Sequence, residues 1–326
     1  MTLSIGIPGS LSAEVVRRIA PVVEEVGYRA LWINDTPDGD ALAGLAAAAE
    51  VTSKLGLATG VVALDRRGGR EIAAHVRDLP ADRVRVGIGT GQARRGLDLL
   101  ATAVAELRSG CDAPILVGAL GPKTRALAAR IADGVLFNWL TPATAAEAMA
   151  QLRQDAGDRL VEGVLYARTI ATPDARPALE AESARYASYP QYAANFARLG
   201  IDPRDTTIDL TRPGAARAFQ VEVDEVVLRL ITATDDVDEL IRAIRTRAVG
   251  PDGPIRAGTR DGYYADTRSP STARYWKLVG SQDFLLVDGV WEGRNGHKTG
   301  PSWWTLTGEI DVDRIEYADL PPGTPV

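Results

Sequence analysis

Eight short apolar segments that alternate with helical patterns constrain the fold of this chain more than any other feature. The clearest unit is PILVGALGPKTRALAARIADGVLFNW at 114–139, where an apolar strand, a glycine turn, a helix and a second apolar strand follow one another. A crossover helix is what returns a chain for parallel pairing, so this stretch predicts two neighbouring parallel strands. The other apolar segments lie near residues 5, 31, 60, 86, 164 and 228.

Helical patterns connect these segments. In the first unit, Ser12 is expected to cap a helix over 13–26 and Gly27 to end it. The third strand is predicted over 57–64, and 201–223 is predicted to be irregular. Eight parallel strands in about 250 residues predict a (β/α)8 barrel, with a doubly wound sheet as the alternative. Further helices are predicted at 40–53, 70–79, 94–108, 143–156, 176–199 with a break at Pro190, and 237–247.

Composition narrows the classes of function. At 326 residues and 45% hydrophobic side chains, the chain can bury one large core and a smaller second one. A net charge of −6 argues against nucleic acid or an anionic membrane as the main partner. One cysteine, Cys111, and two histidines predict neither an internal disulfide nor a metal site. The absence of a signal-peptide pattern and of a membrane-spanning apolar run predicts a cytoplasmic protein.

The character of the sequence changes after residue 250. The segment VGPDGP at 249–254 is a plausible linker, and four of the six tryptophans follow it. The predicted domains are therefore 1–250, the barrel, and 256–326, a small antiparallel β domain. The adjacent Trp303 and Trp304 would form its core or, alternatively, a platform for a flat ligand. Strands are predicted at 283–287, 290–291, 302–306 and 314–317, with a hairpin turn at 288–289.

The turn between the fifth strand and its helix is a candidate anion site. In a (β/α)8 barrel, ligands bind at the carboxyl ends of the strands. Gly118 and Gly121 would let a ligand approach the backbone, Pro122 suits the first helical position, and the free N–H groups of a helix start favour a phosphate. The alternative is that a Gly-Pro turn simply starts a helix.

Several stretches together resemble the luciferase-like flavin- and deazaflavin-dependent oxidoreductases, whose fold is a (β/α)8 barrel. The resemblance covers roughly residues 1–250, with the motifs in the family's order. The stretches are GYRALWINDTP, LATGVVALDRR, RVRVGIGTGQ, VGALGPKTRALAARIADGV and ASYPQYAANFARLG.

The resemblance implies a cofactor site. The family often has a bulge with a non-prolyl cis peptide in its third strand, which backs the isoalloxazine or deazaflavin ring, and the matching dipeptide is Gly60-Val61. Without the resemblance, Gly60 could simply relieve crowding where a strand bends. Residues implied to lie beside the ring are Gly89, Thr90, Gly91 and Gln92, and those implied to grip the phosphate are Gly118, Ala119, Gly121, Pro122 and Lys123.

Two positions depart from the family's deazaflavin-dependent sugar dehydrogenases, which use a histidine and a glutamate to handle the proton. The corresponding residues here are Thr36 and Gln92, and neither side chain is a general acid or base near neutral pH. Reduction of a C=N or C=C bond of a small molecule therefore fits better than alcohol oxidation. Solvent or Asp35 would supply the proton, although a carboxylate at a strand end is as often a turn cap.

Alternatives remain open for the cofactor and the activity. The alanine- and arginine-rich composition suits a high-GC actinobacterium, which favours the deazaflavin F420 over FMN by association. The alternatives are an FMN-dependent monooxygenase and a non-catalytic barrel whose C-terminal domain is an interaction module. The resemblance also suggests a homodimer formed through barrel helices. Tyr189 and Tyr192 are expected to cover the ring or to pack in the core.

Overall fold

The computed structural model describes residues 3–93, 95–212, 215–220, 222–246, 262–266, 274–279, 282–287, 290–293 and 313–315. The chain forms two compact units, Leu3–Ile255 and Arg256–Val326 with Met1–Thr2.

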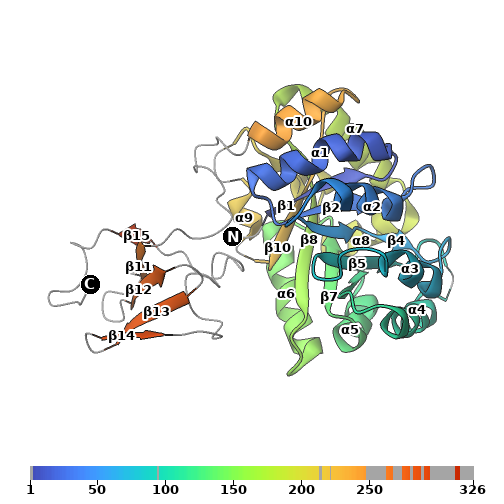
Figure 1. Cartoon of the computed structure of the whole chain (residues 1–326). Coiled ribbons are helices and arrows are strands. Elements are labelled where there is room, and N and C mark those ends of the chain that lie inside the picture. The colour runs from blue at the N-terminus through green and yellow to red at the C-terminus, as the bar shows by residue number, and fades with distance from the viewer. Residues whose placement is uncertain are drawn as a thin grey trace. The chain divides into compact units, whose positions relative to one another are not determined.

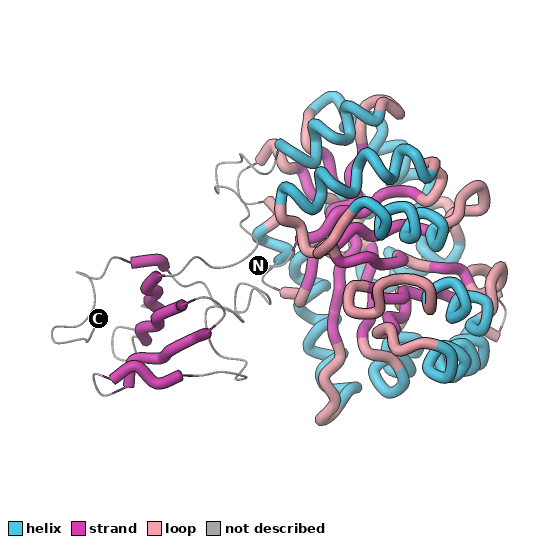
Figure 2. Tube along the Cα trace, in the orientation of Figure 1, coloured by secondary structure: helices cyan, strands magenta, loops and turns pink. Residues whose placement is uncertain are grey.

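Eight parallel strands of the first unit close into a barrel, with helices around it (Figures 1 and 2). Each strand pairs with the next, and the last pairs with both its predecessor and the first, so the ring has no open edge. The predicted (β/α)8 barrel is confirmed, and the doubly wound alternative, which needs an open sheet, is wrong. The barrel strands are β1 (Leu3–Pro8), β2 (Ala30–Asn34), β3 (Gly56–Thr59), β5 (Val84–Gly89), β6 (Ile115–Gly118), β7 (Gly134–Asn138), β8 (Glu162–Ile170) and β10 (Glu225–Ile231).

The predicted third strand is interrupted. A cis peptide bond joins Gly60 to Val61, as expected for this dipeptide, and it separates β3 from the short strand β4 (Val62–Ala63). Both segments pair with β5. A continuous strand over 57–64 is therefore wrong, because the chain bulges at Gly60 before it resumes pairing.

The helices follow the predicted order with small shifts of their ends. Ser12 accepts a hydrogen bond from the Val15 N–H (3.3 Å), and Gly27 ends the first helix at a φ of 87°. The predicted break at Pro190 separates two helices, whereas 201–223 is more regular than predicted because it contains η2, β9 and α9. The helices are α1 (Ala13–Val26), α2 (Ala41–Val51), α3 (Gly69–Val76), α4 (Gly96–Gly110), α5 (Pro122–Ile131), α6 (Pro142–Ala156), α7 (Arg176–Ala187), α8 (Pro190–Leu199), α9 (Arg217–Gln220) and α10 (Val237–Thr246), with η1 (Pro173–Ala175), η2 (Pro203–Thr206) and strand β9 (Ile208–Asp209).

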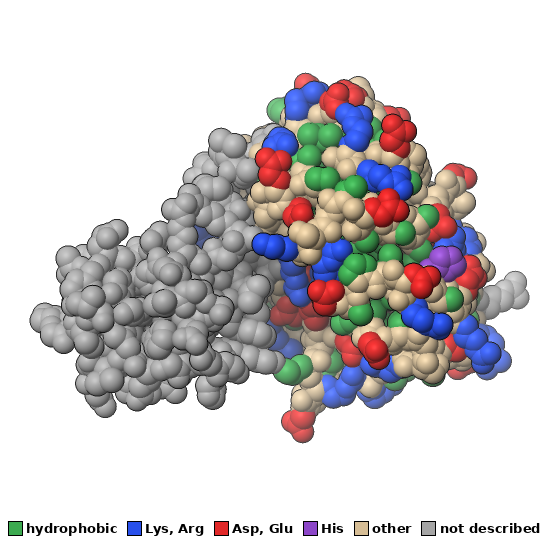
Figure 3. Space-filling model, in the orientation of Figure 1, with side chains coloured by type: hydrophobic (Ala, Val, Ile, Leu, Met, Phe, Trp, Pro, Cys, Tyr) green, Lys and Arg blue, Asp and Glu red, His purple; other side chains and the backbone are tan. Residues whose placement is uncertain are grey.

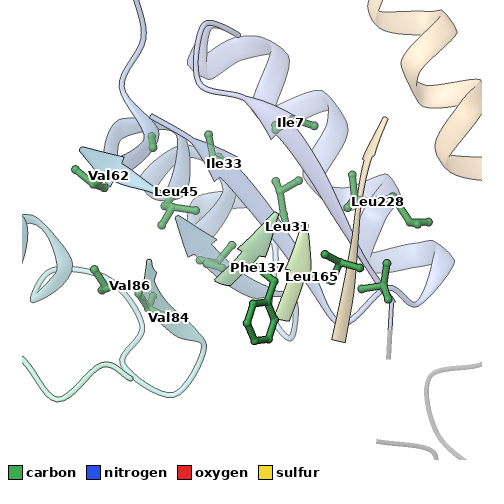
Figure 4. Close-up of a cluster of buried hydrophobic side chains, with 14 of the residues drawn as sticks. Ile7, Leu31, Ile33, Leu45, Val62, Val84, Val86, Phe137, Leu165 and Leu228 are labelled. Atoms are coloured by element: carbon green, nitrogen blue, oxygen red, sulfur yellow. The ribbon is translucent and has the colours of Figure 1, made fainter. Parts of the chain in front are cut away.

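The barrel has a hydrophobic cluster on each side of its wall. Successive strand residues point to opposite faces, so one set faces the helices and the other faces the barrel interior. The larger, outer cluster includes Leu31, Val86 and Leu228, drawn in Figure 4. The inner cluster consists of Ala30, Trp32, Ala58, Leu116, Leu136, Val164, Tyr166 and Val227, with Val61 against it.

A buried ion pair lies at the amino-terminal end of the barrel. Arg85 donates to Glu225 at 2.7 and 3.1 Å, and the Glu225 side chain is fully buried. Glu225 also accepts hydrogen bonds from the Ser4 hydroxyl (2.5 Å) and the Trp32 indole (2.7 Å), and Arg29 lies 2.9 Å away. Burial alone would raise the pKa of Glu225, but Arg85 and Arg29 lower it to about 2. These five residues form what we call the barrel floor.

The lowered pKa makes the floor sensitive to acid. Because the folded-state pKa lies below the ordinary value of 4.5, Glu225 adds stability that is present above pH 4.5 and is lost as the pH falls toward 2. We expect the free energy of unfolding of wild type to fall more steeply between pH 4.5 and 3 than that of Glu225→Gln. Urea unfolding of both proteins at several pH values measures this difference, and parallel curves would contradict the assignment.

The surface of the barrel carries charges of both signs, interspersed over the face shown in Figure 3. Arg17 pairs with Glu50 at 2.8 Å and Arg245 with Glu25 at 2.9 Å, in exposed positions where such pairs contribute little. Among the described residues, no helix has the length and apolar character needed to span a membrane, and no cluster of three or more His, Cys, Asp or Glu could hold a metal.

The second unit contains a five-stranded antiparallel sheet in the order β14-β13-β12-β11-β15. The predicted strands at 283–287 and 290–291 are confirmed as β13 (Gln282–Val287) and β14 (Val290–Gly293), and the one at 314–317 corresponds to the shorter β15 (Asp313–Ile315). The prediction missed β11 (Gly262–Asp266) and β12 (Arg274–Val279). The predicted strand at 302–306, the 288–289 turn, the 249–254 linker and Trp303-Trp304 lie outside the described residues.

Candidate active site

Glycines at the carboxyl ends of β5 and β6 leave room for the Val61 side chain. A Cβ atom at Gly89 would lie 2.7 Å from Cγ2 of Val61, and one at Gly118 would lie 3.2 Å from Cγ1. A Cβ atom at Gly60 would lie 3.1 Å from Tyr166 and 3.2 Å from Trp32. Three of the predicted site glycines are thus brought together around Val61, and we call Gly60, Gly89 and Gly118 the glycine cradle.

A hydrogen-bond chain holds the bulge beside the glycine cradle. The Tyr166 hydroxyl donates to Oδ1 of Asn34 (2.5 Å), and Nδ2 of Asn34 donates to the Gly60 carbonyl (2.7 Å). Burial raises the pKa of Tyr166, although Arg229 and Arg168 oppose this effect, so the phenol stays a donor. Tyr166 was not among the predicted site residues, because it belongs to an apolar strand far from Asn34 in sequence and carries no local signal of its position.

The loop after β5 is fastened to a neighbouring loop. Gly91 has a φ of +57°, and a Cβ atom there would lie 1.9 Å from Oδ1 of Asp65. The Gln92 N–H donates to Oδ2 of Asp65 (2.9 Å). At the start of α4, a Cβ atom at Gly96 would lie 2.7 Å from Cγ2 of Thr90. Glycine is thus required at Gly91 by both backbone conformation and space, and the loop has a fixed path beside the cradle.

Asp35 is engaged in structural contacts. Its carboxylate pairs with Arg66 at 2.6 Å and is only 4% exposed, and it accepts a longer hydrogen bond from the Ala41 N–H (3.4 Å) near the start of α2. The carboxylate is thus occupied by the Arg66 guanidinium and by the backbone at the start of α2. The catalytic role of Asp35 stays a prediction. Next to it, the buried hydroxyl of Thr36 has no hydrogen-bond partner in the described part of the chain.

The turn that precedes α5 borders a hollow of about 200 Å³. Gly121 is the N-cap and Pro122 the first residue of the helix, as predicted. The lining includes Ala119, Gly121, Pro122, Arg125 and Arg198.

The cationic side chains that line this hollow are Arg125 and Arg198, whereas the predicted cation was Lys123. Lys123 lines a separate groove, between α4 and α5. Arg198 donates to the Leu120 carbonyl (3.2 Å), and Arg125 lies one helical turn beyond Gly121. The position of Arg125 could have been inferred from helical spacing, but Arg198 comes from α8, distant in sequence.

A cluster of aromatic rings surrounds Arg168 at the end of β8. Its guanidinium lies 4.2 Å from the ring centroid of Trp139 and 4.5 Å from that of Tyr186. Tyr189 and Tyr192 contact Tyr186 at ring-centroid distances of 5.6 and 4.9 Å. The two tyrosines therefore pack against Tyr186, and Tyr186 in turn packs against the Arg168 guanidinium.

Comparison with known proteins finds a family model that matches part of the barrel. The family model for luciferase-like monooxygenases matches residues 95–250, and the predicted resemblance is confirmed over that range. The turn at 118–123 falls inside the match, whereas Asp35, Gly60 and Gly89 fall outside it. No curated protein matches the sequence.

Solved structures share the fold at low identity. An F420-dependent secondary alcohol dehydrogenase with an F420–acetone adduct is 16% identical, covers 76% of this chain and 98% of its own, and has a TM-score of 0.59. The F420-dependent tetrahydromethanopterin reductase of Methanopyrus kandleri is 18% identical, with 77% and 98% coverage and a TM-score of 0.54. A monooxygenase of Streptomyces bottropensis is 16% identical, with 77% and 98% coverage and a TM-score of 0.58.

Proposed function

Because residues 95–250 match the luciferase-like monooxygenases, we propose that this barrel is an oxidoreductase that binds a deazaflavin or flavin at its mouth. Similar folds are found in proteins whose names specify F420 and in one that binds FMN. These folds support a deazaflavin or flavin cofactor but do not distinguish F420 from FMN. We prefer F420 and hydride transfer to a C=N or C=C bond of a small molecule. A cytoplasmic location and a homodimer stay predictions.

The glycine cradle is the observation that carries this proposal. Gly60 in the bulge after β3, Gly89 at the end of β5 and Gly118 at the end of β6 surround Val61, whose side chain would back a flat ring. The Thr36 hydroxyl, buried and without a partner among the described residues, is a free polar group near the end of β2. These residues fit a planar cofactor.

The turn before α5 would hold the cofactor's phosphate. Gly121 and Pro122 present a helix start, whose free N–H groups favour an anion. Arg198 lines the same hollow and would add charge-assisted hydrogen bonds. Arg125, which pairs with Asp155 at 3.3 Å, would add positive charge opposite Glu147, which also lines the hollow. In this proposal they take the role predicted for Lys123.

The protein's own residues would hold the bulge at the site in position and exclude water. A bound deazaflavin would supply a hydride. Asn34 fixes the Gly60 carbonyl, and Tyr166 fixes Asn34, so the bulge keeps its position during a reaction. Since Asp35 is paired with Arg66, the proton that follows the hydride would come from solvent. Trp139 and Tyr186 would shield the mouth from bulk water beside Arg168.

Titration of the purified full-length protein with F420 and with FMN, in both oxidation states, tests the proposal. We expect a change in cofactor fluorescence with micromolar affinity for F420 and weaker binding of FMN. Tight FMN binding with oxygen consumption would favour the monooxygenase alternative. Binding of neither cofactor would contradict the proposed function and favour a non-catalytic barrel.

A further inference from the structure

Two arginines lie side by side inside the barrel mouth. Arg168 on β8 and Arg229 on β10 are register partners, and their side chains are 3% and 16% exposed. Two residues before Arg229, Val227 belongs to the inner cluster, so the alternation of the strand directs Arg229 to the barrel interior. Like charges in paired positions repel each other, so this arrangement needs a counter-charge.

Glu182 of α7 supplies only part of that counter-charge. It accepts a hydrogen bond from Nε of Arg168 (3.1 Å), while Nη2 of Arg229 is 4.0 Å away and Nη2 of Arg185 is 3.8 Å away. Burial opposes ionisation of Glu182, but Arg229 and Arg168 outweigh it and lower its pKa. Within the described ranges, Glu182 is the one carboxylate that pairs with Arg168 or Arg229.

The charges near the mouth therefore do not cancel. Arg168 also donates to Oδ1 of Asn138, and Arg229 to the Leu230 carbonyl, but both acceptors are neutral. Two largely buried guanidinium groups share one carboxylate, and burying an unpaired charge is costly. An additional anion would remove that cost.

A hydrogen-bond donor beside Arg168, the indole N–H of Trp139, also indicates that an anion binds here. The Trp139 indole N–H is buried and has no acceptor among the residues that the structure describes. The Trp139 ring lies 4.2 Å from the Arg168 guanidinium, and Trp139 adopts a positive φ of 56°. Buried N–H groups in native proteins nearly always have an acceptor, which a bound ligand can provide.

Strand order places this charged pair across the mouth from the glycine cradle. In the closed ring of eight strands, β8 lies opposite β3, which precedes Gly60, and β10 lies opposite β5, which ends at Gly89. A ligand held at the arginines would therefore reach toward the face of a ring held at the cradle.

We propose that the substrate carries a carboxylate, which binds between Arg168 and Arg229 while its reducible bond lies over the cofactor ring. This inference rests on the proposed function and specifies its substrate class as an organic anion with a flat, unsaturated body. Trp139 and Tyr186 provide aromatic surface next to the carboxylate site.

Benzoate and its neutral analogue benzamide test the site, with tryptophan fluorescence of the full-length protein as the readout. We expect benzoate to bind about tenfold more tightly than benzamide, with or without saturating cofactor. Arg229→Gln should remove this preference, and Arg229→Lys, which keeps the charge, should retain most of it. The matched control is Arg185→Gln, which loses an arginine that also faces Glu182 but is 61% exposed, and it should keep the preference.

Three results would overturn the proposal. Equal affinity of wild type for benzoate and benzamide, a result independent of whether any variant folds, would remove the anion site. Loss of benzoate binding when F420 or FMN is bound would assign the arginines to the cofactor's own phosphate. Benzoate binding by a protein that takes neither cofactor would remove the substrate assignment together with the proposed function. In the first of these cases, retained cofactor binding would leave the proposed function intact and remove the anion site alone.

Discussion

Gly89→Val is expected to weaken the binding of F420 and FMN by about 10- to 100-fold, because overpacking at a close contact costs about 1–3 kcal/mol. A Cβ atom at this position would lie 2.7 Å from Cγ2 of Val61. Val61 is only partly buried, so it can move toward the mouth and occupy space that the ring needs. The substitution thus acts on the cradle while the strand pairing of β5 continues.

Fluorescence titration with each cofactor measures the loss, and thermal unfolding reports whether the barrel is folded. The matched control is Gly68→Val, at an exposed position where an added Cβ would meet nothing within 4 Å. Its affinity for the cofactor should equal that of wild type. Unchanged cofactor affinity in a folded Gly89→Val protein would remove the cradle from the site.

Glu225→Gln is expected to lower the free energy of unfolding at pH 7 by about 3–5 kcal/mol, the typical cost of breaking a buried ion pair. The substitution keeps the size of the side chain but removes the charge that Arg85 faces at 2.7 Å. Glu162, at 3.2 Å from Arg85, is shared with Arg29 and offsets only part of the loss. Urea unfolding followed by circular dichroism gives the difference.

The same substitution at an exposed pair provides the control. Glu50 lies 2.8 Å from Arg17, but its side chain is 58% exposed, so Glu50→Gln should cost less than about 1 kcal/mol. If both substitutions had the same small effect, the barrel floor would contribute no more than a surface contact.

Hydrophobic periodicity carried most of the fold prediction. Apolar runs such as Ile115 to Val117 are buried on both faces of the barrel wall, and helical patterns between them require crossover connections. Both signals are local in sequence, so they can be recognised without knowledge of the tertiary structure. The bulge at Gly60 was expected only from family resemblance, since periodicity treats residues 57–64 as one strand.

The charged part of the mouth could not be inferred in the same way. Arg168 and Arg229 are adjacent only because β10 pairs with β8, and their separation in sequence hides that register. Asp35 likewise pairs with Arg66, a residue 31 positions away in the sequence. Lys123 follows the predicted turn, but its side chain lines the groove between α4 and α5, a direction that depends on neighbouring helices.

Closure of the ring has a consequence for synthesis of the chain. Leu3 at the start of β1 pairs with Val226 of β10, a strand that is made about 220 residues later. Until β10 leaves the ribosome, β1 and β8 each keep one edge without a partner. Such edges attract other strands, and contacts between distant residues form slowly. A nascent chain of this protein is therefore most exposed to aggregation just before residues 225–231 emerge, when nearly the whole barrel exists but cannot yet close.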